Sequence, residues 1–330
     1  MQIQTQTHSI TIHVDNRSSS PNLRFLQSQA RWIRDELDPQ IAINGPDALH
    51  SDEILKLDDL LRTLQDASLT ITDLKTTRIH LAVLLICSQG TRWPRRLIDR
   101  SDQLTHMWER KFQSPLKDIG ILLYEPGGRL HGVCQPNDID EEALINHWRE
   151  TNTLGGLFAK QSGSLRFRPG DWWISPLFAY RAGIISTPSR SGGIISDPER
   201  AYAILMTDDS ELCGPNAEEF FYRAADTDRG KFSLTSATPE SRTPVRILRS
   251  HTLRSFHAPK AGVRYDGLYR VTGWRVLPDE KTKKTKYEIG FKRLENEPSM
   301  SSVLRRPTTD EVEDYTEYKR LRRRRRRRGS

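Results

Sequence analysis

The hydrophobic pattern of the chain changes near residue 115, and this change constrains the fold more than any other feature. Before it, apolar residues recur at three- and four-residue steps in the stretches 54–64, 79–86 and 97–112, which is typical of amphipathic helices. After it, short β-branched and aromatic runs alternate with clusters of Gly, Pro and Ser, which indicates strands. The sequence therefore predicts an α+β protein, with an N-terminal α-helical bundle followed by a mainly β barrel or sandwich.

The chain of 330 residues is long enough for two domains, each with its own core. We expect the stretch "IGILLYEPGGRLHGV" (119–133) to form two β segments around a Pro-Gly-Gly turn. The predicted organisation is a disordered segment at 1–20, a helical bundle at 21–150, a β domain at 165–310, and a helix with a disordered arginine-rich tail at 311–330.

The basic charge of the chain is concentrated at one end. The formal net charge is +8, and the segment "KRLRRRRRRR" (319–328) contributes nine positive charges, so the remaining residues sum to −1. A run of like charges is normally disordered, and one this basic fits a nuclear localisation signal or a nonspecific nucleic-acid anchor. A low-complexity terminus without function is the alternative. We expect the protein to lie in the nucleus.

Several classes of function find no support in the residue pattern. No apolar run approaches the roughly 18 residues needed to cross a bilayer, and the N-terminus lacks a secretory pattern. The histidines and the three distant cysteines do not have metal-ligand spacing, and neither a phosphate-binding glycine loop nor a nucleophile elbow is present. We therefore expect no enzyme, no cofactor, no metal site and no membrane partner.

One strand-like stretch, "GVRYDGLYRV" (262–271), carries an interruption in its apolar alternation. A glycine inside a strand pattern marks a bulge or a close backbone approach, so Gly267 predicts an irregular strand. We expect Tyr265, Asp266 and Gly267 to shape the domain more than they touch a ligand. Gly267 would permit the kink, and Asp266 would satisfy nearby amides.

The block "TPVRILRSHTLRSFHAPKAGVRYDGLYRVTGW" (243–274) resembles the SRA (SET- and RING-associated) or YDG domain family. It has the family's P-V-R strand, the A-P-x-x-G-x-R-Y-D-G-x-Y run and an aromatic residue shortly after it. "GDWW" (170–173) and "AGIISTPSRSGGI" (182–194) resemble the family's opening, and "KYEIGFKRLENEPSMSSVLRRPT" (286–308) is similar to the closing segment of fungal members. The resemblance covers about residues 168–310.

This resemblance implies a noncatalytic DNA-binding domain that flips 5-methylcytosine out of the duplex and stacks it between two aromatic rings, while an Asp contacts the cytosine edge. It places Asp208 and Asp209 at the acidic position and Tyr222 at the second aromatic position, followed by Arg223. The first aromatic of the family is replaced near Met206 or Thr207. Tyr222 as a core aromatic, and the two aspartates as a turn between strands, remain open alternatives.

The same resemblance predicts where DNA is contacted outside the pocket. Two loops that enter the duplex in the family correspond to segments that carry Arg190 and Ser191, and Arg229 and Lys231. Two further arginines alternate with apolar residues on a strand and are either phosphate contacts or merely solvated: Arg246 and Arg249.

A weaker similarity concerns residues 53–112, which resemble the N-terminal helical bundle of transcription elongation factor TFIIS. In that family the bundle binds short disordered segments of nuclear partners. The sequence therefore supports two functions: a nuclear DNA-binding chromatin protein, possible partners being methylated DNA, nuclear proteins or histones, or a chromatin adaptor whose SRA barrel does not flip bases. An intact aromatic pocket would favour the first function.

Overall fold

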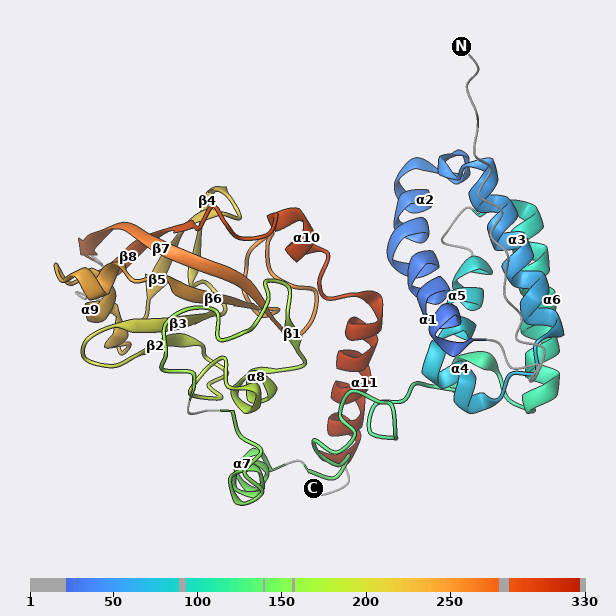
Figure 1. Ribbon diagram of the computed structural model, residues 1–330, viewed down its shortest axis with the longest axis horizontal. Coiled ribbons are helices and arrows are strands. Elements are labelled where there is room, and N and C mark those ends of the chain that lie inside the picture. The colour runs from blue at the N-terminus through green and yellow to red at the C-terminus, as the bar shows by residue number, and fades with distance from the viewer. Residues whose placement is uncertain (1–21, 89–92, 139, 156–157, 279–284, 327–330) are drawn as a thin grey trace, which may run out of the picture. The chain divides into compact units, whose positions relative to one another are not determined.

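The computed structural model describes residues 22–88, 93–138, 140–155, 158–278 and 285–326 (Figure 1). The disorder predicted for residues 1–20 lies outside the described residues. Contacts divide the chain into two compact units, of which the first ends at Arg129 and the second begins at Leu130. The helix α7 (Glu141–Glu150), which falls inside the range 21–150 that we predicted for the helical bundle, therefore belongs to the second unit.

The first unit is helical, and the three helices predicted from periodicity are confirmed as α3, α5 and α6. Local sequence sets some of the ends: the Thr70 hydroxyl and the Asp73 carboxylate cap each other's backbone N–H groups at the start of α4. The elements are α1 (Leu23–Arg31), the π-helical turn η1 (Trp32–Leu37), α2 (Asp38–Asn44), η2 (Pro46–Ala48), α3 (Ser51–Asp66), α4 (Ile71–Thr77), α5 (Ile79–Ile86), α6 (Arg95–Phe112) and η3 (Leu116–Asp118).

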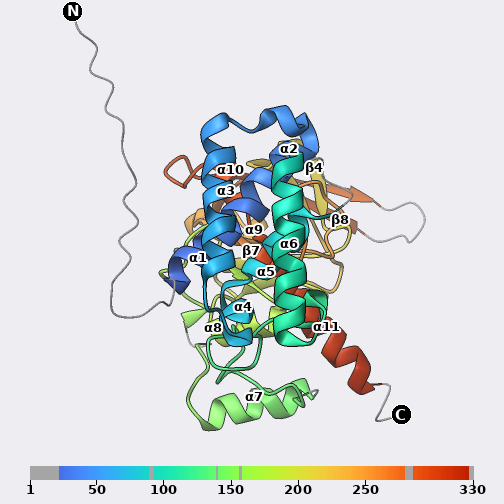
Figure 2. The same cartoon turned by 90° about the vertical axis from the view of Figure 1, so that its right-hand side faces the viewer.

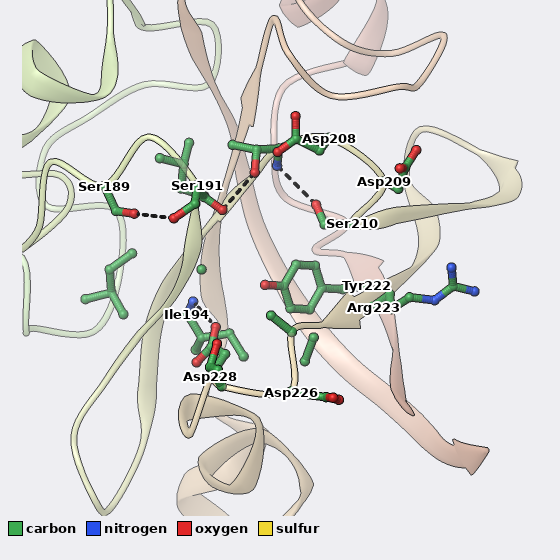
Figure 3. A pocket seen from close by; sticks show the side chains of 18 of the residues that line it. Ser189, Ser191, Ile194, Asp208, Asp209, Ser210, Tyr222, Arg223, Asp226 and Asp228 are labelled. Atoms are coloured by element: carbon green, nitrogen blue, oxygen red, sulfur yellow. Dashed lines mark hydrogen bonds between the residues drawn. The ribbon is translucent and has the colours of Figure 1, made fainter. Parts of the chain in front are cut away.

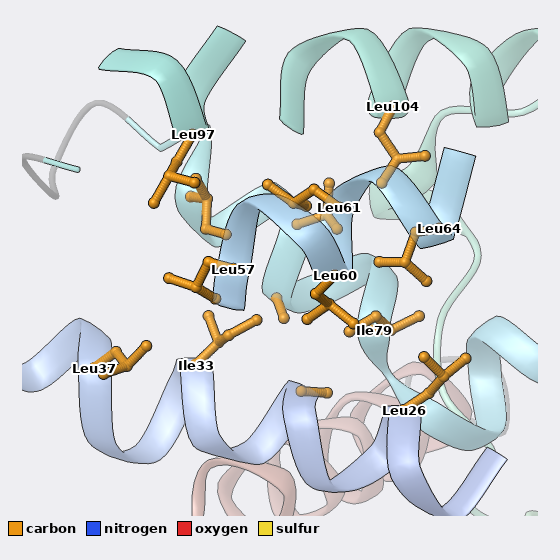
Figure 4. Packing of buried hydrophobic residues seen from close by; sticks show 14 of the residues in the cluster. Leu26, Ile33, Leu37, Leu57, Leu60, Leu61, Leu64, Ile79, Leu97 and Leu104 are labelled. Carbon is orange, nitrogen blue, oxygen red and sulfur yellow. The ribbon is translucent and has the colours of Figure 1, made fainter. Parts of the chain in front are cut away.

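A hydrophobic core, mainly of leucine and isoleucine with the buried Trp93 and Trp108, holds this unit together (Figure 4). The leucines of α3 lie between side chains of α1 and η1 on one side and of α6 on the other. Leu57 and Leu61 of α3 and Leu97 and Leu104 of α6 are fully buried. Each fully buried leucine contributes roughly 1.5–3 kcal/mol through removal of apolar surface from water, so the stripe seen in the sequence is the main stabilising feature of the unit.

The second unit is built on a mixed sheet with the strand order β2-β3-β6-β7-β8-β5-β4, and β1 pairs with β7 beside this path. The pair β3 and β6 is parallel, and the other pairs are antiparallel. The strands are β1 (Trp172–Trp173), β2 (Gly193–Ser196), β3 (Ala201–Met206), β4 (Glu211–Asn216), β5 (Glu219–Ala224), β6 (Val245–Ser250), β7 (Val263–Pro278) and β8 (Thr285–Arg293).

Two sequence predictions about β structure were wrong. The sheet is open, because its end strands β2 and β4 do not pair in the described part of the chain, so it does not form a closed barrel. The segment 119–133 forms turns instead of a hairpin. Leu122, Leu123 and Leu130 of this segment are buried. A Cβ on Gly128 would lie 2.6 Å from the Leu123 carbonyl oxygen, so the chain folds back on itself too tightly for strand pairing.

Helices cover parts of this sheet and contact one another through aromatic rings. Trp148 of α7 (Glu141–Glu150) lies 6.0 Å from Phe178 of α8 (Pro176–Ala182), and Phe178 lies 5.7 Å from Tyr318 of α11, measured between ring centroids.

None of the described helices is both long and apolar enough to cross a membrane. The remaining elements of the unit are α9 (Gly230–Thr235), η5 (Pro239–Arg242), α10 (Met300–Leu304) and α11 (Thr309–Arg326).

The helix predicted near the C-terminus is α11, and it continues to Arg326 through most of the arginine run. We expected this run to be a disordered tail. Asp310, Glu311 and Asp314 in its first part are buried, and Arg306 pairs with Glu311. Because the start of α11 is packed against the unit, the helix extends beyond the packed part into the basic residues. Residues 327–330 lie outside the described residues.

Candidate functional site

A pocket of about 680 Å³ lies where β2 begins and where β3 and β5 end (Figure 3). This volume falls within the roughly 300–1,000 Å³ of small-molecule sites. Its walls come from the loop before β2, the turn after β3, and the end of β5 with the loop that follows. The fold thus brings together residues that the sequence analysis had selected from three separate segments: Ser191, Asp208, Asp209, Tyr222 and Arg223.

Tyr222 forms one wall of the pocket and belongs to the core at the same time. Its side chain is 2% exposed and packs in the hydrophobic cluster that fills the sheet, while its ring edge faces the cavity (Figure 3). Burial, together with the nearby charge of Asp228, raises the pKa of the Tyr222 hydroxyl well above its ordinary value. The phenol is therefore neutral. Tyr222 is a core aromatic that also lines the cavity, and its stacking on a base stays a prediction.

The turn after β3 presents two aspartates that differ in their contacts. Asp208 has a left-handed backbone, with φ of +49°, and its carbonyl accepts a 2.7 Å hydrogen bond from the backbone N–H of Arg254. The carboxylate of Asp209 is engaged by the Arg254 guanidinium at 3.1 Å. Asp208 is therefore the better candidate for an acceptor that a bound molecule reaches, and the turn alternative holds for the backbone of both residues.

The loop before β2 is pressed against β3. The Thr207 hydroxyl donates to the Ser191 carbonyl at 2.9 Å, and the Ser189 and Ser191 hydroxyls lie 2.9 Å apart. Gly192 has a φ of +70°, and a Cβ there would lie 2.3 Å from the Leu205 carbonyl oxygen, so only glycine fits. Arg190, one of the predicted DNA contacts on this loop, pairs instead with Glu141 of α7.

Asp228 is a pocket residue that the sequence analysis missed. Its carboxylate accepts hydrogen bonds from the backbone N–H groups of Ile194 at 2.7 Å and Gly230 at 3.0 Å. It thereby joins the edge strand β2 to the start of α9 and fixes one side of the pocket. An aspartate just before a short helix is a common capping pattern, and this signal in "DTDRG" would have identified the residue.

Arg229 and Lys231, predicted as DNA contacts, and Arg223, predicted as part of the base pocket, have three different outcomes. Arg229 is exposed and remains a predicted contact. Arg223 lines the pocket, but its guanidinium donates to Glu288 at 2.8 Å and points away from the Tyr222 ring (Figure 3). The prediction for Lys231 was wrong, because its side chain is 6% exposed and its ammonium group donates to two main-chain carbonyls, those of Ala225 and Asp226.

The prediction that Arg246 and Arg249 contact phosphates was also wrong, because both side chains are completely buried. Arg246 donates to the carbonyls of Gln161 at 2.7 Å and Gly163 at 2.8 Å, and burial lowers its pKa to about 10. Arg249 donates to the Glu211 carboxylate at 2.7 Å and to that of Asp266 at 2.5 Å. Both arginines thus stabilise the fold from within.

The Tyr-Asp-Gly motif is architectural, as the strand pattern indicates. Asp266 is the extra residue of a bulge, because Ile247 and Leu248 of β6 face Gly267 and Tyr265. Gly267 has a φ of +115°. The prediction that Asp266 satisfies amides was wrong, since its buried carboxylate accepts from Arg249 at 2.5 Å and Arg264 at 2.6 Å. Although burial favours the neutral acid, the charges of Arg264 and Arg249 hold the pKa of Asp266 below its ordinary value.

Within the described ranges, no group of three or more His, Cys, Asp and Glu side chains is arranged to hold a metal ion.

Comparisons with known proteins give partial likenesses. No protein-family model matches the chain, and no curated protein matches its sequence. Among solved structures, KRYPTONITE in complex with mCHH DNA, a histone H3(1-15) peptide and SAH is 20% identical, with a TM-score of 0.40, over 48% of this chain and 39% of that one. The SUVH5 SRA domain in complex with hemimethylated CG DNA is 18% identical, with a TM-score of 0.36, over 42% of this chain and 98% of that one.

Two further solved structures show partial likenesses of the same order. SUVH6 of Arabidopsis thaliana in complex with SAM is 16% identical, with a TM-score of 0.40, over 55% of this chain and 36% of that one. The modification-dependent restriction endonuclease TagI is 18% identical, with a TM-score of 0.33, over 41% of this chain and 53% of that one. The chain spans about two fifths of the length of the KRYPTONITE and SUVH6 structures.

Proposed function

We propose that the second unit is a noncatalytic DNA-binding module of the SRA type and that its pocket receives a modified cytosine swung out of the duplex. The observation that carries this proposal is the meeting of Tyr222 and Asp208 in one cavity. Sequence motifs matched both residues to the base pocket of that family, and they come from separate elements, Asp208 from the turn after β3 and Tyr222 from β5. The fungal type of the family, suggested by the segment 286–308, is part of the same proposal.

The chemistry of the pocket suits a cytosine. The N4 amino group of cytosine is a hydrogen-bond donor, which a carboxylate such as that of Asp208 accepts. Stacking on the Tyr222 ring contributes roughly 1–3 kcal/mol, against a cost of a few kcal/mol for removing the base from the duplex. Tyr222 supplies the one aromatic ring among the described residues that line the pocket. We therefore expect a modest affinity gain from the base.

The arginine run completes the proposal as a nonspecific anchor and a nuclear localisation signal. Six arginines at positions 323–328 follow Arg322, which itself pairs with Glu141 of α7. Replacing these six residues with serine should reduce the steepness of the log-log salt dependence of DNA binding by up to about 5, at ~0.9 per phosphate contact. In this proposal the protein acts on DNA in chromatin and catalyses no covalent step.

The test is a titration of the full chain with duplexes that differ only in cytosine methylation, on neither strand, one strand or both, across a salt series. The preference for a methylated duplex should persist at high salt and disappear in Asp208→Asn and Tyr222→Leu. Asp209→Asn is the matched control, because that carboxylate is already paired with Arg254, and it should keep the preference. Equal binding of all duplexes by the folded wild-type protein would contradict the proposal.

A second candidate function is a chromatin adaptor whose SRA-like sheet does not flip bases. The one-sided pocket and the burial of Lys231, Arg246 and Arg249 favour it, because each removes a DNA contact implied by the resemblance. In this version the first unit, which resembles the TFIIS bundle, recruits nuclear proteins. DNA binding that vanishes when arginines 323–328 are replaced, combined with retained binding of a histone or disordered nuclear peptide, would support the adaptor.

A further inference from the structure

The second unit displays one phenylalanine with almost no contact to the protein. Phe256 is 98% exposed, more than any other large hydrophobic side chain of the described residues. A single exposed apolar residue is ordinary on a protein surface. An aromatic ring that packs on nothing is less common, because aromatic rings usually bury a large area. The surroundings of Phe256 therefore decide whether it has a use.

The loop that carries Phe256 is held on both sides of it. Before it, Leu253 is buried in the core of the sheet. After it, the His257 carbonyl accepts a 2.6 Å hydrogen bond from the Arg264 guanidinium, and the Ala261 carbonyl accepts one of 2.6 Å from the Trp172 indole. The exposed ring thus sits on a fixed support, which makes it a preorganised contact rather than part of a loose loop.

The same loop is bonded to the pocket. The backbone N–H of Arg254 donates to the Asp208 carbonyl at 2.7 Å, and its guanidinium lies 3.1 Å from the Asp209 carboxylate. Both aspartates line the pocket. Phe256 is two residues from Arg254, so their Cα atoms lie within about 7 Å of each other along the chain. Phe256 is therefore carried within two residues of the contact that joins this loop to the acidic turn of the pocket.

The charge of the loop selects the kind of partner. Between His251 and Gly262 the chain carries Lys260 and Arg254, of which Arg254 is paired with Asp209 of the acidic turn, and it has no acidic residue. Lys260 is exposed. Cationic side chains around an aromatic tip match phosphates around stacked bases, whereas an apolar pocket of a protein partner would not need the cations.

We infer that Phe256 is a wedge that enters the base stack at the step from which the modified cytosine leaves. This inference rests on the proposed function. Apolar side chains inserted between base steps are a known means of unstacking DNA. One of the two loops that the family resemblance assigned to this task is folded into α9, with Lys231 buried. The loop of Phe256 is a third element, bonded to the acidic turn of the pocket, and its ring is more exposed than that of Phe232 on α9, which packs edge-on against Tyr287.

The experiment measures binding of the full chain to two duplexes at a salt concentration that suppresses the arginine run. One duplex has the methylated cytosine paired with guanine, and the other has it opposite an abasic site, where the base is already unpaired. A 2-aminopurine next to the target reports unstacking by its fluorescence. The variants are Phe256→Ala and Phe256→Leu, with Phe158→Ala as the matched control, another exposed phenylalanine of the same unit.

Phe256→Ala should weaken binding to the paired duplex about tenfold, which corresponds to one lost stacking contact, and should weaken binding to the abasic duplex much less. Phe256→Leu should lie between, Phe158→Ala should match the wild type, and the 2-aminopurine signal should fall only in the Phe256 variants. Because Phe256 packs on nothing, loss of folding does not confound the result.

Two results would overturn the inference while leaving the proposed function intact. One is wild-type affinity of Phe256→Ala for both duplexes, which would assign the ring to a partner other than DNA. The other is an equal loss on both duplexes, which would make it a simple contact. Failure of the proposed function itself is recognised separately, by a wild-type protein that shows neither a methylation preference nor a 2-aminopurine signal.

Discussion

The two units bury carboxylates in opposite ways. In the first unit, Asp58 is shared by Arg62, Arg96 and Arg100, of which two are about half exposed, and the core of the unit is hydrophobic. In the second unit, Asp266 and both its partners, Arg249 and Arg264, have almost no exposed surface. The comparison shows that the buried carboxylate of the helical unit keeps hydrated partners, whereas that of the sheet unit is enclosed together with both of its partners.

Removal of the interior carboxylate should have the largest effect. Asp266→Ala leaves two buried guanidinium groups without their shared partner, and breaking a buried ion pair costs about 3–5 kcal/mol. We expect the second unit to lose most of its stability, measured as faster amide hydrogen exchange of β6 and β7, while α3 and α5 keep their protection. Unchanged exchange of β7 would show that water already hydrates this network.

Acidification should instead lower the stability of the first unit. His80 is completely buried, its Nδ1–H donates to the Leu74 carbonyl at 3.0 Å, and its Nε2 has no hydrogen-bond partner among the described residues. Burial, with the charges of Arg34 and Arg78, lowers the pKa of His80 to about 4. Between about pH 6.5 and pH 4, His80 is therefore protonated in the unfolded chain but not in the folded unit. The free energy of unfolding is thus greatest above about pH 6.5 and falls as the pH drops toward 4, by about 3 kcal/mol in all.

The measurement is denaturant unfolding of the full chain between pH 7.5 and 4.5, followed by hydrogen exchange of α5. His80→Leu is the control, and its pH profile for α5 should be flat over this range. A wild-type profile as flat as that of His80→Leu would show that the ring is protonated in the folded state.

A smaller effect is expected at the pocket. Gly192→Ala would place a methyl group 2.3 Å from the Leu205 carbonyl at a φ of +70°, a strain of about 1–3 kcal/mol. We expect a lower melting temperature and weaker binding of methylated DNA, because the loop must move away from β3. Gly273→Ala has open space around it and serves as the control. Equal melting temperatures for the two variants would mean that the loop already adopts another backbone conformation.

The smallest effect is expected for the carboxylate of the first unit, Asp58, and it tests the contrast with Asp266 directly. Asp58→Ala removes the carboxylate shared by three arginines in the first unit, but Arg62 and Arg96 remain hydrated, so the cost should be about 1 kcal/mol. Burial favours the neutral acid, yet the hydrogen bonds from Arg96 and Arg100 hold the pKa of Asp58 below its ordinary value. Its contribution is thus present above about pH 4 and is lost as the pH falls through the lower folded pKa. A cost as large as that of Asp266→Ala, measured by urea unfolding, would remove the contrast between the units.

Local periodicity accounts for what the sequence by itself determined. The leucine stripe of α3, the apolar run of β3 and the glycine of the Tyr-Asp-Gly motif each predicted an element that the structure contains, because helix, strand and bulge preferences depend on neighbouring residues. The pairing of Tyr222 with the acidic turn came from motifs, and the fold places them in one pocket.

Contacts between distant residues account for what only the tertiary structure decided. Arg246 looked like a solvated or phosphate-binding residue, but its guanidinium donates to carbonyls more than 80 positions earlier in the chain. Arg249 is buried with the carboxylates of Glu211 and Asp266, and Lys231 is buried against the nearer carbonyls of Ala225 and Asp226. Asp228 lines the pocket because it joins β2 to α9. Whether a charge is buried depends on partners that only the fold supplies, since an unpaired charge pays the full cost of leaving water.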